Sequence, residues 1–590
     1  MTNDPKTGIA GALTRAFIAS PLTPLALFAA LILGVIALIT LPREEEPQIS
    51  VPMVDIQVRA DGLKAEDAVK LVTEPLETIV KSIPGVEHVY SQTRDDAAMV
   101  TARFEVGTSA DAAVLRIHEK IRANLDRIPK GIPEPLIVGR GIDDVAIMVL
   151  TLSPSEAQAD RWTAADLTRV AHEMRVAIAA LPDVGLTYIV GESPAEIRIS
   201  PDPERLAKAG LTLQALAAKI EGANSAFELG MVRSDSQQVG LSVGETLSDL
   251  SAINDILVTT RDGRPIYVRD VADVRLATDT SDARVFNLER QGDGFTRVPA
   301  VSLAIAKRSG ANAVTIAEEI RAEVERLKGA VIPKDLNVSV TRDYGETANE
   351  KANELLFHLG LATLSIVALV GFAIGWREAL VVAIVIPVTI LLTLFAARIM
   401  GYTLNRVSLF ALIFSIGILV DDAIVVIENI ARHWGMGDGR SRKQAAIDAV
   451  GEVGNPTIVA TLTVVVALLP MLFVSGMMGP YMSPIPANAS AAMVFSFFVA
   501  VIVTPWLMMK FGKVHAGGDH GHVGDGGGIL GRGYRKVAAP ILASRRSAGR
   551  FLAVVTVATV GSMGLFYVKA VTVKLLPFDN KSELAVVIDL

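Results

Sequence analysis

Two aspartates stand side by side inside a long apolar run, at Asp421 and Asp422, and apolar residues flank them on both sides. A charged residue at the centre of a membrane-spanning helix costs ~2.5–3.5 kcal/mol, so a pair without a function is hard to retain. Two adjacent carboxyls in a low-dielectric environment do not readily ionise together, and such a pair can bind and release protons near neutral pH. The residues therefore predict a proton-carrying site. Each proton that moves inward releases ~2.3 kcal/mol per 100 mV, which can drive a conformational cycle.

The aspartate pair has no basic partner in this sequence. Lysine and arginine are absent from the central part of every apolar run, and Arg398 lies near the end of one run. A deprotonated pair requires a cation, so we expect a part of the protein outside this sequence to supply it. Glu354, Glu428 and Asn429 are further candidates for accessory polar roles. The sequence has no cysteine and no phosphate-binding loop of the GxxxxGK[ST] type, and we expect no cofactor and no metal site.

Seven apolar runs must position these residues. With a mean hydropathy of +0.43 and 51% apolar residues, the chain is too apolar for an ordinary soluble protein. Each run is long enough for an α-helix to cross ~30 Å of hydrocarbon at ~1.5 Å per residue. We therefore expect seven membrane spans. They cover residues 25–41, 355–374, 379–397, 407–427, 458–474, 491–509 and 551–568.

Basic residues set the expected orientation of the spans. The segment between the fourth and fifth runs carries Arg432, Arg440, Arg442 and Lys443, whereas residues 475–486 contain no lysine or arginine. Basic residues in short loops resist translocation, so we expect the N-terminus in the cytoplasm and the region between the first two runs outside. No small-residue cleavage site follows the first run, which we expect to be retained as an anchor.

The large region between the first two runs contains an internal repeat. A helix-like stretch ends at Ile83-Pro84-Gly85-Val86, and the same pattern recurs at Leu181-Pro182-Asp183-Val184. In each copy a strand-like hairpin and a second helix follow, which predicts a split βαβ sandwich of the ferredoxin type. The expected strands are 88–91 and 98–104, then 186–190 and 195–199, and the expected helices are 109–125 and 203–220. A strand-helix-strand series over residues 300–340 extends this arrangement.

Three segments lie outside the sandwich. Residues 224–274 are typical of hairpins, with turns at 234–235 and 262–263, and we interpret them as a projecting insertion. Residues 516–528 are rich in glycine and predict a flexible cytoplasmic linker, followed by an amphipathic surface helix over 534–546. The sequence ends in a strand-like run at 584–590. We interpret this run as the start of a second outside region, absent here.

The motif from Gly417 to Asn429 resembles the fourth-span signature of the resistance-nodulation-division (RND) efflux pumps, drug-efflux branch. Further similarity lies at residues 41–44, in the Ile-Pro-Gly-Val repeat, at Pro387 and at residues 575–577, and it covers the whole chain. The resemblance implies a proton-driven secondary transporter, not an enzyme, that exports small amphiphilic compounds across the bacterial inner membrane. It also implies a homotrimer with twelve spans per subunit, a periplasmic adaptor (membrane fusion) protein and an outer-membrane channel.

Within this resemblance, Asp421 and Asp422 match the proton-relay aspartates of the family, and Glu354 matches an acidic residue at the start of its second span. The lysine of the family's tenth span has no counterpart here. The expected fold is an α-helical polytopic membrane domain with a large α+β periplasmic domain of ferredoxin-like subdomains. Its parts are a cytoplasmic segment (1–24), a first transmembrane helix (25–42), a porter and docking region (43–352, docking insertion at about 224–274), transmembrane helices two to six (353–510), a cytoplasmic linker and amphipathic helix (511–549), a seventh transmembrane helix (550–570) and the start of a second periplasmic domain (571–590).

Three alternative functions fit the sequence less well. A heavy-metal cation pump of the same fold generally replaces the second aspartate, and Asp422 is retained here. An intramembrane aspartyl protease needs its aspartates on two facing helices, whereas these are consecutive on one helix. A protein-export auxiliary of the same superfamily would lack the duplicated unit.

Neither a metal site nor a nucleic-acid interface is favoured by the remaining residues. His515, Asp519, His520 and His522 lie in the glycine-rich linker, where a metal sensor is the less favoured interpretation. The methionines at 477, 478 and 482 are more typical of an apolar loop than of a soft-metal path. The formal charge of −7 and the absence of a concentrated basic surface argue against nucleic acid as a partner.

Overall fold

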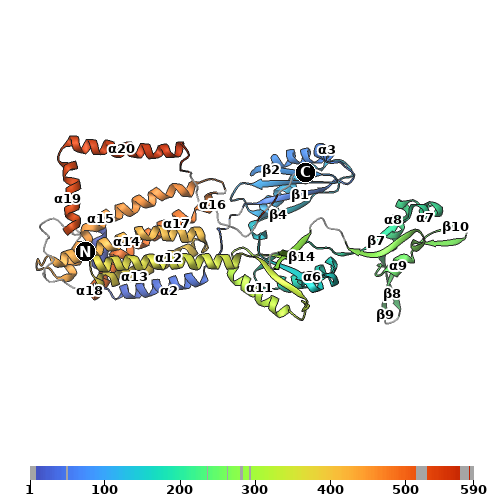
Figure 1. The fold of residues 1–590 in the computed structure, drawn as a ribbon, viewed down its shortest axis with the longest axis horizontal. Coiled ribbons are helices and arrows are strands. Elements are labelled where there is room, and N and C mark those ends of the chain that lie inside the picture. Colours follow the sequence, from blue (N-terminus) through green and yellow to red (C-terminus); the bar gives the residue numbers. More distant parts are fainter. Residues whose placement is uncertain are drawn as a thin grey trace.

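The structure is a computed structural model that describes residues 8–571, Leu584 and Val586, except for positions 48, 50, 235–236, 262, 279–283, 292–293, 477 and 513–527. Apolar helices form a bundle at one end of a long molecule, and mixed helix and sheet units extend beyond the other end of the bundle (Figure 1). The turns expected at 234–235 and 262–263, the histidines of the linker and most of the strand-like run 584–590 include residues outside this description.

Seven helical stretches in the described part of the chain are long and apolar enough to cross a membrane, and one overlaps each of the seven apolar runs. The helices often extend beyond the runs, because charged residues at their ends do not stop the helix. The bundle contains α1 (Gly8–Phe17), α2 (Leu22–Thr40), α12 (Tyr344–Ala373), α13 (Trp376–Ile399), α14 (Arg406–Gly435), α15 (Arg442–Leu468), α16 (Met478–Met482), α17 (Pro484–Phe498) and α18 (Thr504–Phe511).

Helix α14 occupies a central place in the bundle, since it contacts α12, α13, α15, α17 and α18. Most of its buried apolar residues belong to one cluster with those of α2, α13 and α18. The seventh candidate span, α20 (Arg545–Tyr567), differs because it runs apart from the bundle and has no buried residue (Figure 1). The helix before it, α19 (Gly528–Leu542), ends earlier than the amphipathic helix expected over 534–546. Arg545 and Arg546 therefore belong to the first turn of α20.

A first mixed unit follows α2. Its four-stranded antiparallel sheet has the order β2-β3-β1-β4, with helices α3 (Ala65–Ala68), α4 (Glu74–Lys81) and α5 (Ala110–Arg122) between the strands. One sheet face and the helices enclose a core that includes Ile56, Leu76 and Phe104. The strands are β1 (Met53–Arg59), β2 (Val86–Arg94), β3 (Ala97–Phe104) and β4 (Leu136–Arg140).

A second mixed unit repeats this topology with a long insertion. Strand β14 pairs with both β5 and β6, and β15 pairs with β5. When β5, β6, β14 and β15 are numbered one to four in chain order, their order in the sheet is two-three-one-four, as in the first unit. An extra strand, β13 (Val285–Gln291), extends the sheet beside β14. The unit contains β5 (Ala146–Pro154), α6 (Ala164–Ala179), β6 (Val184–Val190), β14 (Gly294–Lys307), α11 (Ala313–Leu327) and β15 (Leu336–Asp343).

The hairpin expected in the second repeat copy is wrong. Strand β7 (Ala195–Pro201) pairs with β12 (Ala272–Thr278) rather than with β6, whose partner is β14. The strand-helix-strand series over 300–340 therefore completes the second mixed unit. The Leu-Pro-x-Val pattern marks the end of a helix and the start of a strand, and this local signal does not choose the partner of the next strand.

A projecting unit lies between β7 and β12 and has its own small core around Leu216, Val258 and Val268. It is larger than the insertion expected at 224–274, because α7 (Pro203–Ala209) and α8 (Leu213–Ala223) belong to it and not to the sandwich. Two hairpins occur as expected, β8 (Ser225–Ser234) with β9 (Gln237–Glu245) and β10 (Leu257–Arg261) with β11 (Arg264–Tyr267). Short helices α9 (Leu250–Asn254) and α10 (Val268–Val271) complete it. In Figure 1 the unit lies farthest from the bundle.

Candidate functional site

The aspartate pair lies near the midpoint of α14, and a reciprocal cap fixes the start of this helix. The side-chain oxygen of Asn405 accepts a hydrogen bond from the backbone N–H of Ser408 at 2.9 Å, and the Ser408 hydroxyl accepts one from the Asn405 N–H at 2.9 Å. Such a cap satisfies backbone donors that would otherwise be unpaired at the helix start. From there α14 continues through Asp421 and Asp422 to Gly435.

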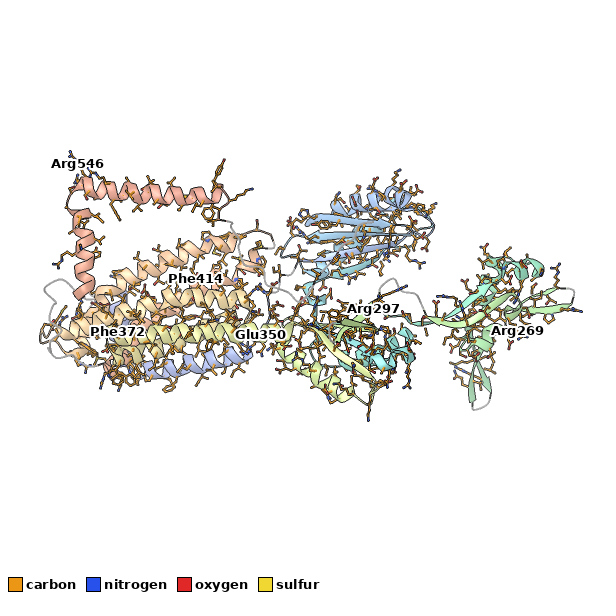
Figure 2. All side chains as sticks on the ribbon, in the orientation of Figure 1. Arg269, Arg297, Glu350, Phe372, Phe414 and Arg546 are labelled. Carbon is orange, nitrogen blue, oxygen red and sulfur yellow. The ribbon has the colours of Figure 1, made fainter. Side chains whose placement is uncertain are left out.

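Asp421 lies on a stripe of α14 that the described part of the chain leaves uncovered. The members recur every three or four residues, which places them on one face of the helix. Phe414 of this stripe is 52% exposed and is labelled on the bundle in Figure 2. The exposed stripe consists of Phe410, Phe414, Gly417, Asp421, Val425 and Glu428. A carboxylate on such a membrane-spanning face is costly unless a polar partner covers it.

Asp422 is half-buried and faces α17 instead. The hydroxyl of Ser496, on α17, lies beside the Asp422 carboxyl and donates a hydrogen bond to the backbone carbonyl of Leu419 at 2.6 Å. Ser496 is buried, so this contact ties α17 to α14 at the level of the aspartates. A π-helical turn, Val499–Val503, follows directly, and such turns are frequent at functional sites.

No ion pair among the described residues includes either aspartate, although the ends of the spans carry many basic side chains. Lys351 of α12, for example, pairs with Glu354 at 3.3 Å. Close to the cytoplasmic end expected for α14, Arg432 pairs with Glu452 at 2.7 Å. The expectation that a cation comes from outside this sequence stays a prediction.

The three accessory candidates take different places in the structure. Glu354 is exposed and bonded to Lys351 of its own helix, with no described contact to the aspartates. Glu428 is exposed on the same stripe as Asp421, two turns further along α14. Asn429 is buried, and its amide donates to the Ala449 carbonyl at 2.7 Å and accepts from Arg432 Nε at 2.9 Å. The amide of Asn429 is therefore used to join α14 to α15.

Two buried polar groups of the bundle were not identified from the sequence. Asn488 of α17 is 1% exposed, and neither atom of its amide has a partner in the described chain. His433 is buried at the end of α14, where its Nε2 lies 2.7 Å from Glu452 Oε2 and its Nδ1 lies 3.4 Å from Arg440 Nη2. Nε2 also lies 3.5 Å from Arg432 Nη2, so guanidinium groups lie beside both ring nitrogens of His433. Asn488 could have been found from the sequence, because it is a polar residue within the mostly apolar sequence of α17.

The loop between α14 and α15 is fixed by charge. Arg440 bonds to Asp438 and to Asp448, at 2.7 Å in the second case. The hydrogen bond from Arg440 holds the pKa of Asp438 below its usual value. No group of three or more histidine, aspartate or glutamate side chains in the described residues is arranged to hold a metal ion.

Seven candidate spans, mixed units beyond one end of the bundle and a carboxyl pair inside one span are the features of a multi-pass membrane protein. The sequence profile described as the AcrB/AcrD/AcrF family matches residues 13–590, and the chain belongs to this family of RND permeases. The resemblance seen at Gly417–Asn429 is thereby confirmed.

Two curated relatives share the name multidrug resistance protein MdtC. The protein of Pantoea ananatis (strain AJ13355) is 28% identical over 497 residues, which cover 84% of this chain and 47% of the relative. The protein of Edwardsiella ictaluri (strain 93-146) is 28% identical over 491 residues, which cover 83% of this chain and 46% of the relative. The chain thus spans about half the length of the curated relatives it matches.

Proposed function

We propose that the protein takes part in proton-driven export of small organic, amphiphilic compounds across the bacterial inner membrane. The observation that carries the proposal is the carboxyl pair at the middle of α14, with Asp421 on an exposed stripe and Asp422 beside Ser496. No cation among the described residues pairs with either aspartate, so the charged form of the pair is disfavoured, which suits a group that binds and releases protons. The relatives named for multidrug resistance support drug-like compounds as the cargo.

The mixed units support a large periplasmic domain of ferredoxin-like subdomains. Both units contain strand, helix, two strands, helix and strand in that order, with the sheet order two-three-one-four. This is the connectivity expected of a split βαβ sandwich. Together with the basic loop residues, it supports a cytoplasmic N-terminus and porter units outside the inner membrane.

Membership of the RND permease family supports a homotrimer that works with a periplasmic adaptor protein and an outer-membrane channel. The exposed stripe of α14 and the uncovered α20 support further helices packed on this bundle. Such helices would provide the cation that a deprotonated aspartate pair requires.

The direct test replaces Asp421 or Asp422 by asparagine in the protein as the cell makes it. Asparagine keeps the size of the side chain and removes the titrating group, so each variant is expected to insert normally and to lose at least about tenfold in efflux. Efflux of ethidium, a small amphiphilic dye, is measured in cells matched for membrane protein. The control is Asp126→Asn, the same exchange on the exposed surface of the first mixed unit. Full efflux by both aspartate variants would rule out the proton role.

A further inference from the structure

A buried ion pair lies at the junction between the bundle and the second mixed unit. Lys307 is the last residue of β14, and its Nζ lies 2.8 Å from Glu44 Oε1, just after α2. The two side chains are only 6% and 4% exposed. Neither group lies in the membrane-spanning part of a helix, so the pair is not a charge held in hydrocarbon.

The pair is held by charge more than by hydrogen bonds. Glu44 Oε1 and Lys307 Nζ make no hydrogen bond of good geometry with the described residues, although they are in ion-pair contact. Both residues also line a cavity of about 250 Å³, together with Ile147, Ala313 and Tyr344. A Coulomb attraction in a buried place changes steeply with distance, and the cavity leaves space for the two side chains to move.

The second carboxylate oxygen of Glu44 connects this pair to the start of α14. Glu44 Oε2 accepts a hydrogen bond from the hydroxyl of Thr403 at 2.9 Å. Thr403 is in turn bonded through its hydroxyl and its carbonyl to the side-chain amide of Asn405, the residue that caps α14. Backbone bonds between Glu44 and Leu404 and between Leu404 and Pro42 hold the two segments together.

Continuous contacts therefore run from the helix with the aspartates to the sheet of the second mixed unit. Helix α14 begins at Arg406, beside Thr403, and is a single helix to beyond Asp422. A shift or rotation of this helix moves Thr403 and hence Glu44. Lys307, at the end of β14, then follows the carboxylate, because separation of the buried charges is costly.

We propose that Glu44 and Lys307 form a positioning pair that transmits movement of α14 to β14. The proposal rests on the proton-binding function proposed for Asp421 and Asp422, and it assigns to the pair the mechanical link between that site and the mixed unit. The pair is not needed for stability as such, since an apolar pair of similar size often replaces a buried ion pair without loss. Its charge is needed for coupling.

The test compares single and double neutral variants. Glu44→Gln and Lys307→Met each leave one charge buried without a partner and are expected to lower the amount of folded protein. The double variant removes both charges, and we expect its thermal unfolding in detergent to resemble that of the unaltered protein, with ethidium efflux at least tenfold lower. Lys328→Met, which removes an exposed pair with Glu325 in the same unit, is the matched control with full efflux.

The variant Thr403→Val tests the proposal if the double variant does not fold. It removes the hydroxyl that joins Glu44 to the segment before α14 and leaves every charge in place. We expect normal folding with efflux reduced severalfold, and Thr403→Ser, which keeps the hydroxyl, is expected to restore efflux. Full efflux by a folded double variant, or by Thr403→Val, would overturn the proposal.

An infrared measurement separates this proposal from the proton-binding one. The carboxylic C=O band assigned through Asp421→Asn and Asp422→Asn is expected to persist in the double variant, because the proton site itself is intact. Efflux retained beside an intact band would overturn the coupling role alone. Absence of a titrating band from the unaltered protein would overturn both proposals.

Discussion

The carboxyl groups of α14 and the carboxyl group of Glu44, at the junction before this helix, lie in opposite environments. Asp421 and Asp422 lie in the apolar bundle, one exposed on an uncovered stripe and one beside a serine, with no ion pair among the described residues. Glu44 lies at the junction, buried and 2.8 Å from an ammonium group. An unpaired carboxyl in an apolar bundle is costly to ionise, which favours its protonated form, whereas a cation beside a buried carboxyl favours the charged form. The comparison teaches that one acidic site suits proton binding and the other suits force transmission.

The largest expected difference between the two sites is in stability. Lys307→Met leaves the Glu44 carboxylate buried and unpaired, which costs about 3–5 kcal/mol, so less folded protein and earlier thermal unfolding are expected. Asp422→Asn removes a carboxyl that is costly to ionise in the bundle, and no loss of stability is expected. Thermal unfolding of both variants in detergent measures this difference.

The control for this prediction is Lys328→Met in the same mixed unit. Its pair with Glu325 is exposed, and exposed pairs contribute about 0–1 kcal/mol. If Lys307→Met unfolds at the same temperature as this control, the buried pair contributes no more to stability than the exposed pair, and the comparison fails.

A smaller effect is expected at an exposed pair in the first mixed unit. Lys64 Nζ lies 2.7 Å from Asp95 Oδ2, and this hydrogen bond holds the pKa of Asp95 below its usual value of 3.8. A carboxyl with a lowered pKa in the folded state stabilises above its unfolded pKa, and this contribution is lost as the pH falls through the lower, folded value. Asp95→Asn is therefore expected to cause a slight loss at pH 7 that vanishes in acid.

Salt sharpens the same comparison, because screening acts on exposed charges and much less on buried ones. Unfolding of Asp95→Asn, measured in low salt and in about 1 M salt, is expected to approach that of the unaltered protein in the second case. The defect of Lys307→Met is expected to persist there. A defect at Asp95 as large and as insensitive to salt as that at Lys307 would contradict the distinction between exposed and buried pairs.

The candidate site was predictable because its signal is local. Two aspartates within an apolar run stand out in the sequence whatever the tertiary structure, and the seven runs are each recognisable from length and hydropathy alone. The neighbours of the pair were not predictable. Ser496 lies beside Asp422 only because α17 packs on α14. The sequence around a serine in an apolar helix does not predict which residue of another helix it contacts.

Pairings between distant residues account for what the sequence did not reveal. Glu44 and Lys307 belong to different parts of the molecule, and no spacing relates them. The partner of β7 was also missed, since the repeated Leu-Pro-x-Val pattern predicts a strand but not the strand beside it. In Figure 2, Glu350 lies at the end of α12 next to the second mixed unit and Phe372 lies towards the far end. One continuous helix, α12, therefore joins the second mixed unit to the bundle, two regions that are predicted separately from the sequence.

The most direct test of the account asks which carboxyl changes its charge. Infrared difference spectra of the complete protein in membranes, recorded on acidification from about pH 8 to about pH 5, report protonation through the carboxylic C=O band. We expect a band that disappears when Asp421 and Asp422 are both replaced by asparagine and that is unchanged in Glu44→Gln. A band that survives the loss of both aspartates and disappears in Glu44→Gln would contradict the account.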